Sequence, residues 1–141
     1  RRRRIRRAAY DNQEERYLKD MAALNQIKQN TPVSSTPFKV EDFDFGEELG
    51  NNIRILKDVK NAESGFYLVV AVHSDVTKRD EFLTNTVASG RADISFFFDV
   101  NTSKYYIFYQ KFDSLIEARN SLQSKDSKPY NSKMTIVKIE N

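Results

Sequence analysis

The chain has 141 residues, no cysteine and a single histidine, His73. This composition excludes disulfides, thiolate metal sites and cysteine nucleophiles, and it leaves no second histidine for a metal-binding pair. Six of the 23 basic residues lie within residues 1–7, so the remaining chain carries 17 basic against 20 acidic side chains and has a net charge of −3. Any basic surface for nucleic acid or acidic lipid is therefore confined to the N-terminal segment. No apolar run approaches the roughly 20 residues that span a bilayer.

Residues 1–30 are rich in helix-forming residues and contain no glycine or proline. Tyr10, Tyr17 and Leu24 recur every seven residues and give a narrow apolar stripe, which predicts a charged helical arm. A solvated linker without a partner is one interpretation of this arm. The other is contact with phosphate-bearing lipid, nucleic acid or an acidic protein surface. The residues that would make this contact are Arg1, Arg2, Arg3, Arg4, Arg6 and Arg7.

Residues 31–61 are a linker or lid segment by their chemistry. Pro32 and Pro37 each bias the preceding residue away from the helical conformation. Residues 38–59 then carry more apolar side chains than a disordered tether, in a partly alternating pattern. Two interpretations stay open. The segment packs on its own domain as an extra strand or lid, or it docks onto another chain.

Residues 62–141 begin with the strongest strand signal in the chain. The run over residues 65–73 is rich in β-branched and aromatic residues on both faces, which predicts a central strand. A helix follows from about residue 77, with Asp75 or Thr77 as its N-cap, and Gly90 ends it.

The remaining elements complete a regular order. Strands are predicted over residues 93–99 and 104–111, and they are close enough to pair as a hairpin. Ser114 then caps a helix over residues 115–122, and residues 134–139 form the last strand. The order is βαββαβ. It predicts an α+β fold of the split βαβ type, with one antiparallel sheet and two helices on a single face.

Alternation of side chains along a strand predicts which of them face away from the helices. Such an outward face would be apolar and aromatic, and it would require a ligand or a cover. Replacing two of its aromatic residues should then leave the helix-side core intact. The predicted ligand-binding or partner-binding residues on this face are Tyr67, Val69, His73, Tyr106, Phe108 and Gln110.

Three phrases in this region resemble SPOR-like domains: the opening 65–70, the hairpin end 109–113 and the helix phrase 114–119. They are most similar to domains at the C-terminus of Bacteroidota envelope proteins of the type IX secretion and gliding motility machinery, of the PorP/SprF type. The resemblance covers residues 64–141. It implies a periplasmic module, forming the C-terminal part of an outer-membrane-associated protein, that anchors or scaffolds the assembly.

The resemblance also implies a ligand, because SPOR domains bind glycan strands of peptidoglycan through this sheet face. Val69, Tyr106 and Phe108 stand where such domains typically carry glutamine and arginine. The loss of these hydrogen-bonding groups favours docking of a protein partner from the envelope machinery, or a second copy of the chain, over a glycan.

RNA binding is the third alternative, because βαββαβ is also the order of the RRM. Tyr67 would occupy the aromatic position on its first strand, and the aromatic run 104–109 would match the third. Tyr105 stands at the glycine position of that motif, and the domain has no basic excess, so both observations disfavour RNA.

Catalysis, a metal and a cofactor are not expected. His73 is predicted to be a structural or contact residue at a strand end. The carboxylates at strand ends and helix starts are explained by capping, and the four glycines match no phosphate-binding loop.

An isolated peptide of residues 1–30 is predicted to be largely non-helical, because its apolar stripe is narrow and its arginines repel one another. Circular dichroism at low salt measures this directly. A monomeric peptide that is stably helical on its own would contradict the prediction.

Overall fold

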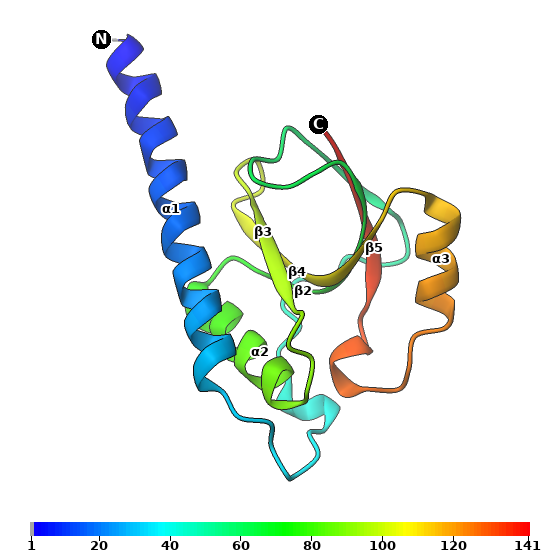
Figure 1. The fold of residues 1–141 in the computed structure, drawn as a ribbon. Coiled ribbons are helices and arrows are strands. Elements are labelled where there is room, and N and C mark those ends of the chain that lie inside the picture. Colours follow the sequence, from blue (N-terminus) through cyan, green and yellow to red (C-terminus); the bar gives the residue numbers. More distant parts are fainter. Residues whose placement is uncertain (1) are drawn as a thin grey trace.

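The computed structural model describes the backbone of residues 2–141 and the side chains of residues 13–141. The protein is α+β, with a five-stranded, mixed and curled sheet and three helices (Figure 1). The helices are α1 (Arg2–Asn30), α2 (Val76–Ala88) and α3 (Leu115–Gln123). The strands are β1 (Arg54–Lys57), β2 (Gly65–His73), β3 (Ser95–Asp99), β4 (Lys104–Phe112) and β5 (Thr135–Glu140). Their order in the sheet is β1-β5-β2-β4-β3.

The predicted α+β class is confirmed, and the local signals for helix starts act as expected. The carboxylate of Asp75 accepts a hydrogen bond from the backbone N–H of Thr77 at 2.7 Å, so Asp75 is the N-cap of α2. The hydroxyl of Ser114 accepts from the backbone N–H of Glu117 at 3.2 Å at the start of α3. These caps lie where the sequence placed them.

The sheet differs from the predicted one by an added strand. β2 pairs antiparallel with both β4 and β5, and β3 pairs antiparallel with β4. β1 pairs with β5 in the parallel direction, with Arg54 opposite Val137. The sheet is therefore mixed and not antiparallel throughout, because a strand from the segment 31–61 joins its edge. This segment packs on its own chain, as the first of its two interpretations proposed.

Two irregularities interrupt the pairing of β2 with β4. Val69 lies opposite Phe108 and Ala71 lies opposite Ile107, so Val70 is an extra residue between two pairs. On β4, Tyr109 is skipped in the same way. An extra residue transfers the side chains beyond it to the other face of the sheet.

Apolar side chains form two cores, one on each face of the sheet. We call the cluster on the side of α2 and α3 the first core and the opposite cluster the second core. Members of the first core include Leu68, Val70, Phe82, Leu83, Val87, Phe96, Ile107, Ala118 and Ile136. The second core consists of Leu56, Val59, Tyr67, Val69, Val72, Phe97, Tyr106, Val137 and Ile139.

Helix α1 belongs to the folded unit through its C-terminal half. Leu24 is buried in the first core, and Met21 and Ile27 pack against that core. The N-terminal half extends away from the body of the protein (Figure 1). The interpretation of the arm as a solvated linker is therefore wrong for residues 20–27. Leu18, by contrast, is 64% exposed and faces solvent.

A buried arginine joins α1 to α2 and to the sheet. The side chain of Arg79 is 1% exposed, and its Nη1 donates to Asp20 Oδ1 at 2.7 Å. Its Nε donates to Asp80 Oδ1 at 2.9 Å. The guanidinium also lies over the rings of Phe96 and Tyr105, at 4.6 Å from each centroid. Two carboxylates and two aromatic rings thus contact the group, which offsets the cost of burying its charge.

Burial and hydrogen bonding shift the pKa of two groups in this cluster, Arg79 and Tyr105. Burial lowers the pKa of Arg79, but its hydrogen bonds with Asp20 and Asp80 outweigh that effect and the net shift is upward. Burial, followed by a hydrogen bond with Asp20, raises the pKa of Tyr105 to about 12. Arg79 is therefore charged and Tyr105 neutral at neutral pH.

Replacing Arg79 by methionine should destabilise the fold by about 3–5 kcal/mol, because Asp20 would be left buried without its cation. Urea unfolding measures the loss. The control is Lys78→Met on the same helix, whose ion pair with Asp44 spans 3.8 Å between two exposed side chains. That variant should lie within about 1 kcal/mol of the wild type. Equal losses for the two variants would contradict the assigned role of Arg79.

Candidate functional site

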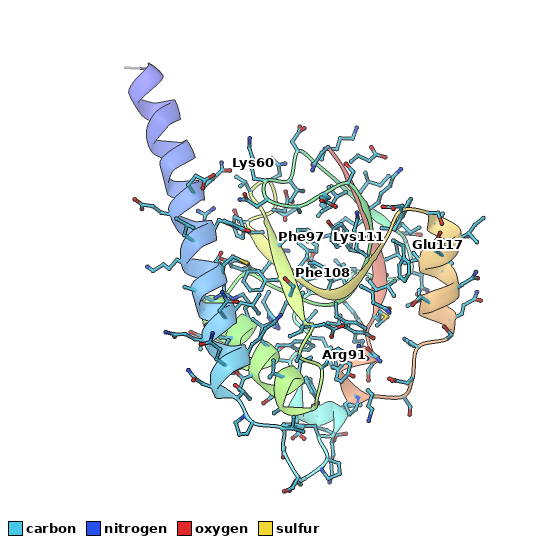
Figure 2. All side chains as sticks on the ribbon, in the orientation of Figure 1. Lys60, Arg91, Phe97, Phe108, Lys111 and Glu117 are labelled. Atoms are coloured by element: carbon cyan, nitrogen blue, oxygen red, sulfur yellow. The ribbon has the colours of Figure 1, made fainter. Side chains whose placement is uncertain are left out.

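Four of the predicted binding residues lie together on one face, as expected, but that face is not open. Tyr67, Val69, Tyr106 and Phe108 all belong to or pack against the second core. The rings of Tyr67 and Phe108 meet edge to face at 4.7 Å. Val69 and Tyr106 are 0% exposed and Phe108 is half-buried. Figure 2 shows Phe108 and the neighbouring Phe97 inside the curl of the sheet. The expectation of an exposed aromatic sheet is wrong.

The chain itself covers this face with residues 46–62, which we call the cover. Leu56 and Val59 are buried in the second core, and Leu49 and Ala62 pack against it. The apolar residues that are too numerous for a disordered tether are thus the ones that pack against this face of the sheet. Their burial supplies the free energy that holds the cover in place.

Backbone hydrogen bonds attach the cover at its start. The N–H of Glu47 donates to the carbonyl of Val72 at 2.9 Å, and the N–H of Val72 donates to the carbonyl of Phe45 at 3.1 Å. Gly46 lies between them with a φ of 72°, and a Cβ at this position would stand 1.8 Å from the Val72 oxygen. Only glycine allows the chain to approach β2 this closely.

Polar side chains attach the cover at the rim. Nη1 of Arg54 in β1 donates to the hydroxyl of Tyr106 at 3.0 Å and lies 3.3 Å from the carboxylate of Glu47. Lys104 donates to the same carboxylate at 2.8 Å, and this hydrogen bond is the main cause that lowers the pKa of Glu47. The hydrogen bond with Tyr106 is the main cause that raises the pKa of Arg54. The hydroxyl of Tyr106, one of the predicted binding residues, is therefore engaged within the chain.

His73 and Gln110 do not join the other four predicted residues. His73 is buried, and its Nε2 lies 2.6 Å from the carbonyl oxygen of Asp44. Gln110 accepts a hydrogen bond from the hydroxyl of Ser121 in α3 at 2.9 Å, so it lies on the helix side. Both residues follow the irregularities in the pairing of β2 with β4, which reverse the faces predicted by simple alternation.

The arginine block cannot be placed in the same detail. Arg1 lies outside the described residues, and the side chains of the other five lie outside the described side chains. Their backbone belongs to α1, which begins at Arg2.

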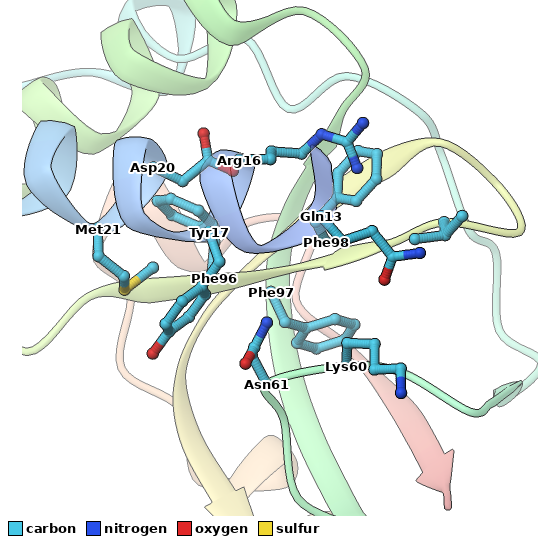
Figure 3. Close-up of a pocket in the computed structure, with 11 residues that line it drawn as sticks. Gln13, Arg16, Tyr17, Asp20, Met21, Lys60, Asn61, Phe96, Phe97 and Phe98 are labelled. Atoms are coloured by element: carbon cyan, nitrogen blue, oxygen red, sulfur yellow. The ribbon is translucent and has the colours of Figure 1, made fainter. Parts of the chain in front are cut away.

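An apolar groove opens between α1 and the edge strand β3, and Figure 3 shows it in close-up. We call it the α1–β3 groove; its volume is about 30 Å³. Three segments form it, which are α1, the end of the cover, and β3 with the residue that follows it. The lining residues are Gln13, Arg16, Tyr17, Asp20, Met21, Lys60, Asn61, Phe96, Phe97, Phe98 and Val100.

The groove has aromatic walls and a polar rim. The amide ends of Gln13 and Asn61 and the ammonium group of Lys60 surround the ring of Phe97 (Figure 3). The guanidinium of Arg16 lies over the ring of Phe98, at 4.4 Å from its centroid. Hydrophobicity patterns in the sequence did not point to this site, because its three segments meet only in the tertiary structure.

The Oε1 atom of Gln13 is the most unusual group in the groove. It is buried and has no hydrogen-bond partner among the described residues. Buried polar atoms are almost always satisfied, and one that is not costs free energy until a donor reaches it. The arrangement can therefore hold an apolar group, and a turn of the Gln13 amide would present an acceptor beside it.

A second and wider cleft lies between residues 43–51 and the start of β5, with a volume of about 690 Å³. Its walls carry charges of both signs, and an ion pair of 3.1 Å joins Lys133 to Glu48 there. The cleft lies beside the irregularity at Val70 in β2. Its lining mixes apolar, acidic and basic side chains, so it does not indicate one class of ligand.

Among the described residues, no three His, Cys, Asp or Glu side chains are grouped so that they could hold a metal ion. None of the described helices is long and apolar enough to cross a membrane. Comparison of the chain with protein-family models, with curated proteins and with solved structures finds no match in any of the three.

Replacing Tyr106 and Phe108 together by alanine should destabilise the protein strongly, by about 3–5 kcal/mol or more, because both rings belong to a packed core. This outcome is the reverse of the one expected for an open face. Urea unfolding measures it, with Ile116→Ala as the control at a side chain that is 74% exposed. A double variant as stable as the control would contradict the covered face.

Proposed function

We propose that this protein is a non-catalytic docking module that binds a protein partner at the α1–β3 groove. The observation that carries the proposal is the groove itself, where aromatic side chains form the walls, polar and cationic groups form the rim, and the buried Oε1 of Gln13 has no hydrogen-bond partner among the described residues. Aromatic anchors with polar groups at the rim are the composition of protein-binding surfaces. The sheet face is less suited to this role, because the cover occupies it.

We further propose that the module is SPOR-like and acts in the periplasm, as a scaffold within a type IX secretion or gliding assembly. The sequence resemblance over residues 64–141 supports this placement. The chain order β2, α2, β3, β4, α3 and β5 also supports it, because it is the order of a split βαβ unit. The four strands lie in the sheet in the order β5-β2-β4-β3 with antiparallel neighbours, which suits the same unit.

Glycan binding by the sheet face is less favoured than protein docking. A glycan would have to displace the cover, which is held by buried Leu56 and Val59 and by the hydrogen bond of Arg54 to Tyr106. The two tyrosine hydroxyls on that face are already engaged, because that of Tyr67 donates to the carbonyl of Glu63 and that of Tyr106 accepts from Arg54. RNA binding by the same face meets the same obstacle.

Site-specific photo-crosslinking in the native host tests the docking proposal. Val100 lines the groove and is 45% exposed, so p-benzoylphenylalanine at this position should give one discrete protein adduct. The matched position is Ile116 on α3, which is exposed and outside the groove. We expect no such adduct from that position.

Co-sedimentation of the purified chain with peptidoglycan sacculi provides the second arm. We expect the wild-type chain to remain in the supernatant. Sedimentation with sacculi, or equal adducts from Val100 and Ile116, would count against docking at the groove.

A further inference from the structure

We infer that the α1–β3 groove binds an extended acidic peptide segment of the partner, with one apolar side chain inserted between α1 and β3. This inference rests on the proposed docking function and names the chemistry of the partner. Three independent features of the groove lead to it: its size, its charge and its unsatisfied acceptor.

The size of the groove selects a single side chain. A volume of about 30 Å³ holds roughly two water molecules and is far below the volume of a typical small-molecule site. The rings of Phe97 and Phe98 and the thioether of Met21 line this space. The tip of an aliphatic side chain such as leucine therefore fits into the groove, and the partial burial of that side chain provides affinity.

The charge around the groove selects an acidic segment. Among the described residues, neither Arg16 nor Lys60 has a carboxylate within ion-pair distance. The one carboxylate in the lining, that of Asp20, is already paired with Arg79. Two cations that lack a carboxylate partner among the described side chains thus flank an apolar slot, which favours carboxylates on either side of the inserted side chain.

The same helix continues this cationic character toward its N-terminus. The sequence places six arginines in residues 1–7, and residues 2–30 are one helix. Position 4 lies about 14 Å along the helix from position 13, at a rise of 1.5 Å per residue. About four extended residues cover that span, so an acidic segment seated in the groove can reach the arginine block.

The unsatisfied acceptor selects a peptide over other acidic ligands. Oε1 of Gln13 is buried beside the slot and requires a donor. Gln13 is half-buried and lines the slot, so a turn of its amide end brings Oε1 to a backbone N–H of an extended peptide, a donor that an aliphatic carboxylate or a polyphosphate lacks. The side-chain amide of Asn61 lies on the opposite side of the slot and can pair with the same backbone (Figure 3).

Nitrogen-15 NMR titration of the full chain tests the inference with defined peptides. The probe is Ac-Glu-Glu-Leu-Glu-Glu-NH2, and the two matched peptides replace leucine by serine or all glutamates by lysine. We expect the probe to shift the amide signals of residues 13–21, 60–61 and 96–100. The serine peptide should bind about tenfold more weakly or not at all, and the lysine peptide should not bind.

Two variants of the protein complete the test. Lys60→Glu should weaken binding of the probe severalfold, because it reverses one of the two flanking charges. Lys128→Glu reverses an exposed charge in the loop after α3 and should leave binding unchanged. Unperturbed core signals in both spectra show that the variants are folded.

The outcomes separate this inference from the docking proposal. Equal binding of the acidic and lysine peptides, or unchanged binding in Lys60→Glu, overturns the inference that the bound segment is acidic. The absence of shifts with the probe overturns it as well. Shifts of the groove signals with protein concentration alone would assign the groove to a second copy and overturn it also. In each case a discrete crosslink from Val100 would leave the docking proposal standing, whereas loss of that crosslink would overturn docking itself.

Discussion

The buried pairing of Arg79 with Asp20 decides where α1 lies, and the rest of the functional surface depends on that position. A guanidinium with 1% exposure is tolerated only because two carboxylates and two aromatic rings surround it. One of those carboxylates comes from α1, and the rings come from the edge strand β3 and its neighbour β4. The helix is consequently held against β3, and the α1–β3 groove is the space left between them. Without this contact the arm would be the solvated helix that its narrow stripe suggests.

A second constraint is that an aromatic sheet face has to be covered. Here the cover is a segment of the same chain, and it combines three kinds of attachment. Leucine and valine side chains fill the second core, Gly46 permits a close backbone approach to β2, and Arg54 binds the hydroxyl of Tyr106. The aromatic residues that look like a binding surface in the sequence are therefore a core. The surface available to partners moves to the edge of the sheet, where α1, β3 and the end of the cover meet.

The local structure of residues 62–141 could be predicted because its signals are local. Asp75 and Ser114 act as caps through hydrogen bonds within three residues, and the run 65–73 is apolar enough to be a strand in any context. The faces of the strands could be predicted only as far as alternation continues. Val70 and Tyr109 have no partner in the register of β2 with β4, and nothing in their side chains distinguishes them from regular strand residues. His73 and Gln110, which lie beyond these positions, were consequently placed on the wrong face.

By itself, the sequence determined the helical arm, the elements of residues 62–141 and their order, the α+β class and the clustering of Tyr67, Val69, Tyr106 and Phe108, because propensity, capping and alternation act over a few residues. It also showed that the segment 31–61 has more apolar residues than a tether needs. Only the tertiary structure decided that residues 46–61 of this segment belong to the cover, that β1 pairs in parallel with β5, and that α1 docks beside β3. These outcomes depend on contacts such as Arg54 with Tyr106 and Asp20 with Arg79, which join residues 52 and 59 positions apart. Pairings over such separations follow from the packing of the whole chain and leave no periodic pattern in the sequence.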